Sequence, residues 1–409
     1  MTEKRTASQH FIELEEKYGA HNYHPLPVVL KRGRGVFVWD VSEKIYFDCL
    51  SAYSAVNQGH CHPRIVDALK NQAEELTLTS RAYYNNVLGE YEKFITKMFG
   101  YDKVLPMNTG VEAVETALKL ARRWAYEVKK VKDEKAVIIV AKNNFHGRTT
   151  GVISFSTDPD SKRKFGPYMP GYETIPYDNI PALRKALKNK YVAGFLVEPI
   201  QGEAGVIVPA EGYLKQAYAL CKKANVLFIA DEIQTGLART GKMLACDYEN
   251  VKPDILILGK ALSGGTIPVS AVLASDEIML TIKPGEHGST YGGNPLASAV
   301  AIEALKVIKE EFLAENALVM GKLFRDQLKM MKSKVFINIR GKGLLNGVTI
   351  PSRRKDAAWT FCLKLMENGL LAKPTHGDKI RFAPPLIVSE DQISEMVDII
   401  YRTQKGFKI

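Results

Sequence analysis

The sequence predicts an α/β fold: a mainly parallel central sheet with helices on both faces, joined to a smaller α+β domain. Between about residues 56 and 300, short apolar runs alternate with helical patterns, which is typical of a parallel sheet covered by helices. From about residue 301 onward, long amphipathic helices and short strands follow one another, which indicates the α+β part. The candidate strands are 36–40, 44–48, 136–140, 193–198, 226–230, 255–258, 269–274, 335–340, 347–350 and 379–383.

Three stretches are expected along the 409 residues, because a chain of this length is long enough for two domains. Residues 1–55 begin irregularly and contain the first two candidate strands, whose short connection resembles a hairpin. This segment is expected to contribute to the small domain and to the active site. Residues 56–300 form the large domain, and residues 301–409 form the small C-terminal α+β domain.

Composition and charge exclude several classes of function. The formal charge is +11, but the basic residues are scattered and no basic stripe with interleaved aromatics appears, so nucleic-acid binding is not expected. No apolar stretch is long enough to span a membrane. Five cysteines without paired spacing suit a reducing compartment, and they form no zinc pattern. The acidic N-terminus lacks a signal core, so a cytoplasmic location is expected, although a removed mitochondrial presequence would leave no trace.

The first candidate site is an anion site at a helix start. Lys103 to Gly110 leads into the apolar helical stripe that contains Ala117, Leu118 and Leu120. Asn108 or Thr109 can cap this helix, and Gly110 lets backbone amides approach an anion. Free N–H groups and the helix dipole then favour a phosphate.

Two charged residues end buried strands of the predicted sheet. Asp231 follows the apolar run 226–230, and Lys260 follows the apolar run 255–259. Taken singly, Asp231 could be a helix N-cap and Lys260 could be a lysine that reaches solvent. Ligands of open α/β sheets bind beyond the carboxyl ends of the strands, so both side chains should face one crevice. A desolvated lysine forms Schiff bases with carbonyl cofactors, and pyridoxal 5'-phosphate (PLP) also requires an acid at its ring nitrogen.

Several distant motifs together resemble the fold-type I, class III PLP-dependent aminotransferases, and among them the enzymes that act on ornithine. The resemblance covers nearly the whole chain. The motifs are Gly19-Ala20-His21-Asn22-Tyr23, Ser54-Ala55-Val56-Asn57-Gln58-Gly59-His60, Val197-Glu198-Pro199-Ile200-Gln201-Gly202-Glu203, Asp231-Glu232-Ile233-Gln234, Leu258-Gly259-Lys260-Ala261 and Gly288-Ser289-Thr290-Tyr291-Gly292-Gly293-Asn294-Pro295.

The resemblance implies roles around the cofactor. Lys260 binds its aldehyde covalently and later shuttles the proton, while Asp231 holds the ring nitrogen. The remaining expected contacts are Gln234 near the ring hydroxyl, Phe145 on the ring face, Gly110 and Val111 at the phosphate, and Thr290 with Ser289 at the phosphate of the neighbouring subunit. The active site is therefore expected to need a homodimer.

The resemblance also implies the substrates, L-ornithine and 2-oxoglutarate. Arg381 is expected to bind the carboxylate of the keto acid through its fork. During the ornithine half-reaction Glu203 is expected to pair with Arg381, so that ornithine's own carboxylate is not captured there. Arg148 is assigned to the α-carboxylate of ornithine, Tyr23 to its α-amino end, and Tyr53 to the pocket wall.

Two departures from the ornithine pattern leave the choice of amine donor open. His146 stands where ornithine enzymes often carry a bulkier aromatic, and Thr266-Ile267 stands where an aromatic is often found. Acetylornithine or 4-aminobutyrate is the alternative amine donor. An aminomutase, which would turn over without 2-oxoglutarate, and a catalytically silent scaffold relative are two further hypotheses. The presence of Lys260, Asp231, Gln234 and Arg381 together argues against the silent relative.

Overall fold

The computed structural model describes residues 7–351, 354, 356–375 and 377–407. Its centre is a seven-stranded sheet in the order β4-β10-β9-β8-β7-β5-β6. The strands are β4 (Lys103–Met107), β10 (Ser270–Ala274), β9 (Ile255–Leu258), β8 (Leu227–Asp231), β7 (Val192–Val197), β5 (Val137–Ala141) and β6 (Tyr172–Ile175). The five strands from β9 to β6 pair in parallel, and β10 is antiparallel to both of its neighbours.

The five inner strands β10, β9, β8, β7 and β5 are buried on both faces and are nearly continuous apolar runs rather than alternating ones. On one face, Ile138, Leu196 and Ile229 pack with the helix α5 (Gly110–Glu127). On the other face, Phe195 and Phe228 pack with residues of the helices α8 (Ile180–Ala186) and α9 (Tyr213–Lys223). The mainly parallel α/β sheet expected from the sequence is confirmed.

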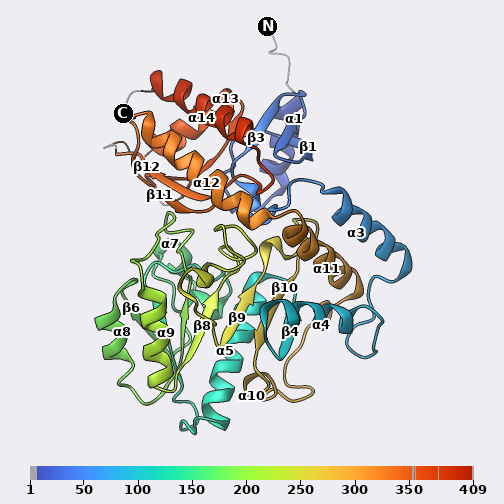
Figure 1. Ribbon diagram of the computed structural model, residues 1–409, viewed down its shortest axis with the longest axis vertical. Coiled ribbons are helices and arrows are strands. Elements are labelled where there is room, and N and C mark those ends of the chain that lie inside the picture. The colour runs from blue at the N-terminus through green and yellow to red at the C-terminus, as the bar shows by residue number, and fades with distance from the viewer. Residues whose placement is uncertain (1–6, 352–353, 355, 376, 408–409) are drawn as a thin grey trace.

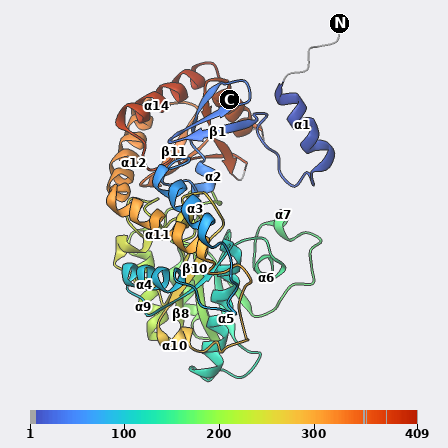
Figure 2. The same cartoon turned by 90° about the vertical axis from the view of Figure 1, so that its right-hand side faces the viewer.

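The remaining helices connect and cover these strands (Figures 1 and 2). They are α1 (Ala7–Tyr18), α2 (Ser51–Ser54), α3 (Pro63–Glu75), α4 (Leu88–Phe99), α6 (Thr150–Ile153), α7 (Pro159–Lys162), α8 (Ile180–Ala186), α9 (Tyr213–Lys223), α10 (Asp276–Met279), α11 (Pro295–Glu310), α12 (Leu313–Met330), α13 (Ala357–Glu367) and α14 (Glu390–Lys405), with 3₁₀ turns η1 (Ala245–Glu249) and η2 (Lys260–Ser263).

The two ends of the chain lie together above the central sheet in Figure 1. Two four-stranded sheets build this part, in the orders β1-β2-β3-β13 and β11-β12-β15-β14. Their strands are β1 (Leu30–Arg34), β2 (Phe37–Asp40), β3 (Ile45–Asp48), β11 (Ile337–Lys342), β12 (Leu345–Thr349), β13 (Leu370–Leu371), β14 (Lys373–Thr375) and β15 (Lys379–Phe382). The hairpin expected near the N-terminus is β2 and β3, and β3 pairs in parallel with β13 from the C-terminal stretch.

The division into stretches at residues 55 and 300 stays a prediction, and residues 1–6 of the first stretch lie outside the described residues. The helix α1 has no buried residue, and Figure 2 shows it standing apart from the rest of the fold.

One fully buried arginine joins the two parts of the molecule. Arg239 follows β8 in the chain, and its guanidinium donates to Asn57 Oδ1 at 2.6 Å, Pro384 O at 2.6 Å and Leu344 O at 3.1 Å. Burial lowers the pKa of Arg239 to about 9. Arg239 thus fixes the segment after β15 relative to the central sheet.

Neither membrane spans nor metal clusters are found within the described ranges. No helix there is long and apolar enough to cross a bilayer. No group of three or more histidine, cysteine, aspartate or glutamate side chains there could hold a metal ion.

Candidate active site

Four neighbouring parallel strands deliver polar residues to one edge of the central sheet. Lys260 follows β9, Asp231 ends β8, Glu198 follows β7, and His146 lies in the loop after β5. Since these strands are adjacent and parallel, their carboxyl ends meet at the same crevice. A cavity of about 210 Å³ lies there and is lined by Gly110, Val111, Phe145, His146, Gly147, Glu198, Ile200, Glu203, Asp231, Ile233, Gln234, Thr235 and Lys260.

Lys260 is the candidate nucleophile of this cavity. Burial lowers the pKa of its amine, with the carboxylates of Glu203 and Asp231 opposing that shift. A lowered pKa leaves more of the amine neutral, which is the form that attacks a carbonyl. The backbone of Lys260 has a φ of 42°, a left-handed conformation that is unfavourable for a non-glycine residue. Such conformations concentrate at functional sites.

Asp231 also lines the cavity, and its carboxyl group is bonded to a histidine. His146 Nδ1 and Asp231 Oδ2 are 2.6 Å apart, and both side chains are buried. Burial alone would lower the pKa of His146, but the hydrogen bond and charge of Asp231 and the charge of Glu198 raise it. The hydrogen bond with the imidazole holds the Asp231 carboxyl group in one orientation in the cavity wall.

Glu198 is a third titratable group in the cavity wall. It accepts a hydrogen bond from the backbone amide of Phe145 at 3.1 Å. Burial raises the pKa of Glu198 to about 8, with His146 opposing this shift and Asp231 adding to it. A strongly shifted acid in a cleft is typical of a functional site.

The sequence interpretation missed the contribution of His146 and Glu198. Glu198 could have been found by the same reasoning that found Asp231, because it also directly follows a buried parallel strand. The contact between His146 and Asp231 joins the loop after β5 to the end of β8, and no local pattern indicates it.

The start of α5 provides the anion site. Thr109 and Glu112 form a capping box in which Thr109 Oγ1 accepts from the Glu112 amide at 3.4 Å, and Glu112 Oε2 accepts from the Thr109 amide at 3.0 Å. The amides of Gly110 and Val111 have no partner within the helix itself, and both residues line the cavity. Gly147, with a φ of 125°, comes so near Val111 that an added Cβ would lie 2.3 Å from Val111 Cγ2.

These residues fit PLP. Amides of a helix N-terminus suit its phosphate, an acid suits its ring nitrogen, and a lysine with a lowered pKa suits its aldehyde. Phe145 lines the same cavity and can cover the ring.

The buried Arg381 forms an ion pair with the partly buried Glu203 at the wall of this cavity. Arg381 Nη1 donates to Glu203 Oε1 at 2.6 Å, and the arginine side chain is only 2% exposed. Burial would raise the pKa of Glu203, but the charge of Arg381 holds it below its ordinary value. Arg381 Nε is buried and finds no partner among the described residues. The guanidinium therefore has a spare donor for a second carboxylate.

Three further predicted residues surround that pair. The Tyr53 ring lies 5.3 Å from the guanidinium carbon of Arg381, and the Tyr53 carbonyl accepts from Gln234 Nε2 at 3.2 Å. Burial raises the pKa of Tyr53, and Glu203, Arg381, Tyr23 and Arg148 all contribute to the balance. The side chains of Arg148 and Tyr23 are exposed, with Arg148 lying 5.6 Å from the Phe145 ring.

Ser289 and Thr290 do not line the cavity of their own chain. Ser289 Oγ instead accepts from Asn108 Nδ2 at 2.8 Å, next to the start of α5. Their expected contact with a phosphate across a subunit interface stays a prediction.

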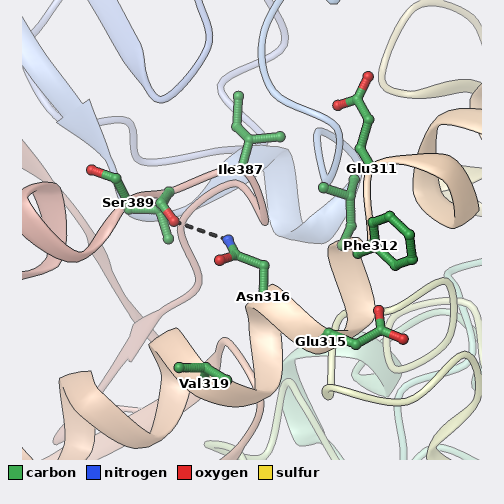
Figure 3. A pocket seen from close by; sticks show the side chains of 9 residues that line it. Glu311, Phe312, Glu315, Asn316, Val319, Ile387 and Ser389 are labelled. Atoms are coloured by element: carbon green, nitrogen blue, oxygen red, sulfur yellow. Dashed lines mark hydrogen bonds between the residues drawn. The ribbon is translucent and has the colours of Figure 1, made fainter.

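A second hollow, of about 600 Å³, lies between the start of α12 and the segment after β15 (Figure 3). Asn316 there donates to the carbonyl of Val388 at 2.9 Å. Its described lining residues include Glu311 and Glu315 but no lysine or arginine, so it does not suit an anionic cofactor or substrate.

Comparison with known proteins bears on the chemistry of the first cavity. The family description "Aminotransferase class-III" matches residues 18–403. "Ornithine aminotransferase, mitochondrial" from Rattus norvegicus is 63% identical over 401 residues, which cover 98% of this chain and 91% of that protein.

Two solved structures are similar along nearly the whole chain. An ornithine aminotransferase from Toxoplasma gondii, with partial occupancy of PLP at its active site, has a TM-score of 0.97 at 49% identity, covering 98% of this chain and 95% of that one. An acetylornithine aminotransferase from Elizabethkingia anophelis has a TM-score of 0.90 at 58% identity, covering 98% and 99%.

Proposed function

Because the chain belongs to the class III aminotransferases, we infer that it is a PLP-dependent enzyme that transfers the δ-amine of L-ornithine to 2-oxoglutarate. The products are glutamate 5-semialdehyde, which cyclises to pyrroline-5-carboxylate, and glutamate. The structural observation that carries this conclusion is the ion pair of the buried Arg381 with Glu203, which lines the same cavity as Lys260. An ornithine enzyme must hide a carboxylate-binding arginine in one half-reaction and offer it in the other.

The residues of the chain divide the work between them. PLP supplies an electron sink for the carbanion that forms at the reacting carbon. Lys260 would hold the aldehyde of PLP at its Nζ, and its amine would move the proton at the reacting carbon. Asp231, oriented by His146, would keep the ring nitrogen protonated. Gly110 and Val111 would bind the phosphate through their amides.

Substrate selection belongs to the groups around Arg381. While Glu203 accepts from Arg381, the carboxylate of ornithine finds no open guanidinium next to the reacting carbon. Arg148 and Tyr23 then hold the distant amino-acid head. When 2-oxoglutarate enters, its carboxylate takes the place of Glu203 and also uses the spare Nε of Arg381, so that binding becomes bidentate.

The test is single-turnover absorbance of the PLP-loaded protein without keto acid. L-Ornithine should convert the cofactor to its amine form fastest, and 2-oxoglutarate should then restore it. N-Acetylornithine and 4-aminobutyrate are the matched comparisons, and the first is favoured as a rival by the similarity to the E. anophelis enzyme. A faster response to either of these amines would identify that amine, rather than ornithine, as the substrate. No response to any of the three would contradict the proposal that the protein is an aminotransferase.

We further propose a homodimer in which Thr290 and Ser289 of one subunit reach the phosphate of the other. Support comes from their position outside their own cavity and from the bond between Ser289 and Asn108 beside α5. Mixing inactive Lys260→Ala and Thr290→Ala subunits should restore activity, because one hybrid site carries neither change. A mixture as inactive as its parts, with hybrid dimers present, would contradict a shared site.

The cytoplasmic location expected from the sequence is also proposed. Unpaired cysteines support a reducing compartment. The rat relative carries "mitochondrial" in its name, so the mitochondrial matrix is the competing location. Cell fractionation decides between them, and enrichment with matrix markers would contradict the cytoplasm.

A further inference from the structure

Four successive non-glycine residues next to the active site adopt left-handed backbone conformations. The φ angles of Ser51, Ala52, Tyr53 and Ser54 are 48°, 46°, 61° and 75°, and the ψ angles of Ala52 and Tyr53 are 49° and 37°. In L-residues this conformation brings Cβ close to the following carbonyl oxygen, so a whole turn of it is unfavourable. Such a turn persists only where surrounding contacts determine it, and it marks places where geometry matters for function.

The contacts that hold this left-handed turn begin at Asp48. Its Oδ1 accepts from the amides of Leu50 at 2.8 Å and Ser51 at 2.9 Å, while its Oδ2 lies 2.7 Å from His60 Nε2. The amide of Ala55 donates to Ser51 O at 2.8 Å and closes the turn. The buried hydroxyls of Ser51 and Ser54 have no partner within the described part of the chain. Side-chain bonding of these two serines therefore does not explain the turn.

Tyr53 links the turn to the substrate-selecting ion pair through a closed circuit of contacts. Its carbonyl accepts from Gln234 Nε2 at 3.2 Å, and the same nitrogen donates to Glu203 Oε1 at 3.3 Å. Glu203 pairs with Arg381 at 2.6 Å, and the Arg381 guanidinium lies 5.3 Å from the Tyr53 ring. One backbone conformation thus places both the carbonyl and the ring of Tyr53, which hold the ion pair from two sides.

We propose that the left-handed turn Ser51–Ser54 is a specificity-determining element that holds the Glu203–Arg381 pair closed, with Ala52 as a positioning residue acting through Tyr53. This inference rests on the proposed function, because closure of the pair matters only if carboxylates compete for Arg381. A turn that relaxed to a right-handed conformation would move both contacts of Tyr53 together. Arg381 would then be open to the carboxylate of an α-amino acid during the first half-reaction.

Ala52 allows a clean test, because its side chain is exposed and a substitution there acts mainly through the backbone. Glycine adopts left-handed conformations freely and asparagine tolerates them, whereas valine, with its branched Cβ, does not. Ala52→Val should raise the ratio of kcat/KM for α-transamination of glutamate to that for δ-transamination of ornithine by about tenfold or more. Ala52→Asn should keep the ratio within about twofold of the wild-type ratio.

Thermal unfolding of the PLP-loaded protein provides a second readout. Ala52→Gly should raise Tm by roughly 1–2 °C, since it removes the left-handed penalty. The matched control is Ala73→Gly, at an exposed alanine of the right-handed helix α3, which should lower Tm. A fall in Tm for both glycine variants would contradict the proposal that the turn is strained. A folded Ala52→Val protein with the wild-type ratio would contradict the role of the turn in substrate selectivity.

The outcomes also separate this inference from the proposed function. If the wild-type protein does not respond to ornithine, the proposed function is contradicted. The signs of the Tm shifts of Ala52→Gly and Ala73→Gly still show whether the turn is strained. If Ala52→Val does not fold, Ala52→Thr replaces it, because threonine keeps the branched Cβ and its hydroxyl suits an exposed position. A wild-type ratio in folded Ala52→Thr then contradicts the role in selectivity.

Discussion

Removing the carboxylate of Glu203 should change which amino acid the enzyme accepts. The Arg381 Nη1 to Glu203 Oε1 distance of 2.6 Å and the 2% exposure of the arginine side chain describe a desolvated, charge-assisted bond. Such bonds contribute about 1.5–3 kcal/mol. Since 1.4 kcal/mol corresponds to a factor of ten, an open Arg381 should favour a competing carboxylate by about 10- to 100-fold.

The assay is the half-reaction of the PLP-loaded protein with glutamate and, separately, with ornithine, followed by cofactor absorbance. Glu203→Ala should raise the glutamate-to-ornithine ratio of kcat/KM by that factor. Glu203→Gln should raise it less, because its amide oxygen still accepts from Arg381. Glu211→Ala, which removes an exposed glutamate outside the cavity, is the control for loss of one negative charge.

The free energy of unfolding should fall in the Glu203 variants, because a buried arginine without its partner is costly. Breaking a buried ion pair by removing one partner costs about 3–5 kcal/mol, so circular dichroism must first show that Glu203→Ala is folded. A folded Glu203→Ala protein whose ratio stays within twofold of the wild-type value would refute the idea that Glu203 hides Arg381.

Three further predictions follow from single groups. Lys260→Ala should bind PLP without a covalent link and lose turnover by at least about a thousandfold, seen in the cofactor spectrum and in steady-state rates; near-normal turnover would contradict its role. Burial, opposed by His146 and aided by Asp231, raises the pKa of Glu198 from 4.5 to about 8, so its contribution to stability is present below pH 4.5 and is lost as pH rises through 8. The Tm of Glu198→Gln minus that of wild type should therefore grow between pH 4.5 and about pH 8 and level off above that, and a constant difference would argue against a protonated Glu198. Arg239→Met leaves the buried acceptors Asn57 Oδ1, Leu344 O and Pro384 O unpaired. It should therefore lower the free energy of unfolding, measured by urea titration, by about 3–5 kcal/mol. An unchanged urea midpoint would show that the hydrogen bonds of Arg239 do not stabilise the fold.

The sequence alone predicted the central sheet well, because its strands are short continuous apolar runs whose burial on both faces requires no knowledge of their partners. Ile255–Leu258 has the predicted bounds, and the other central strands that were predicted differ by only one residue at one or both ends. The ends of β8 and β9 then placed Asp231 and Lys260 at one edge, since parallel strands share the direction of their carboxyl ends. Two strands of the central sheet, β4 and β6, were not predicted, nor were the short strands β1, β13 and β14 outside it.

The pair formed by Glu203 and Arg381 was expected only through resemblance to a family. Nothing in either local sequence indicates that residues from the segment after β7 and from β15 meet, because that meeting depends on how the two parts of the fold pack. Arg239, which fixes the segment after β15, shows the same limit: its three acceptors come from three distant segments.

What the sequence determined by itself was the class of fold and the chemical types at the strand ends, since both follow from local patterns of apolar and charged residues. Only the tertiary structure decided that His146 bonds to Asp231, that β10 runs antiparallel within the sheet, and that Ser51 to Ser54 form a left-handed turn. Contacts between distant segments depend on the packing of the whole chain. A left-handed turn without glycine is unfavourable locally and exists because Asp48, Gln234 and Arg381 surround it.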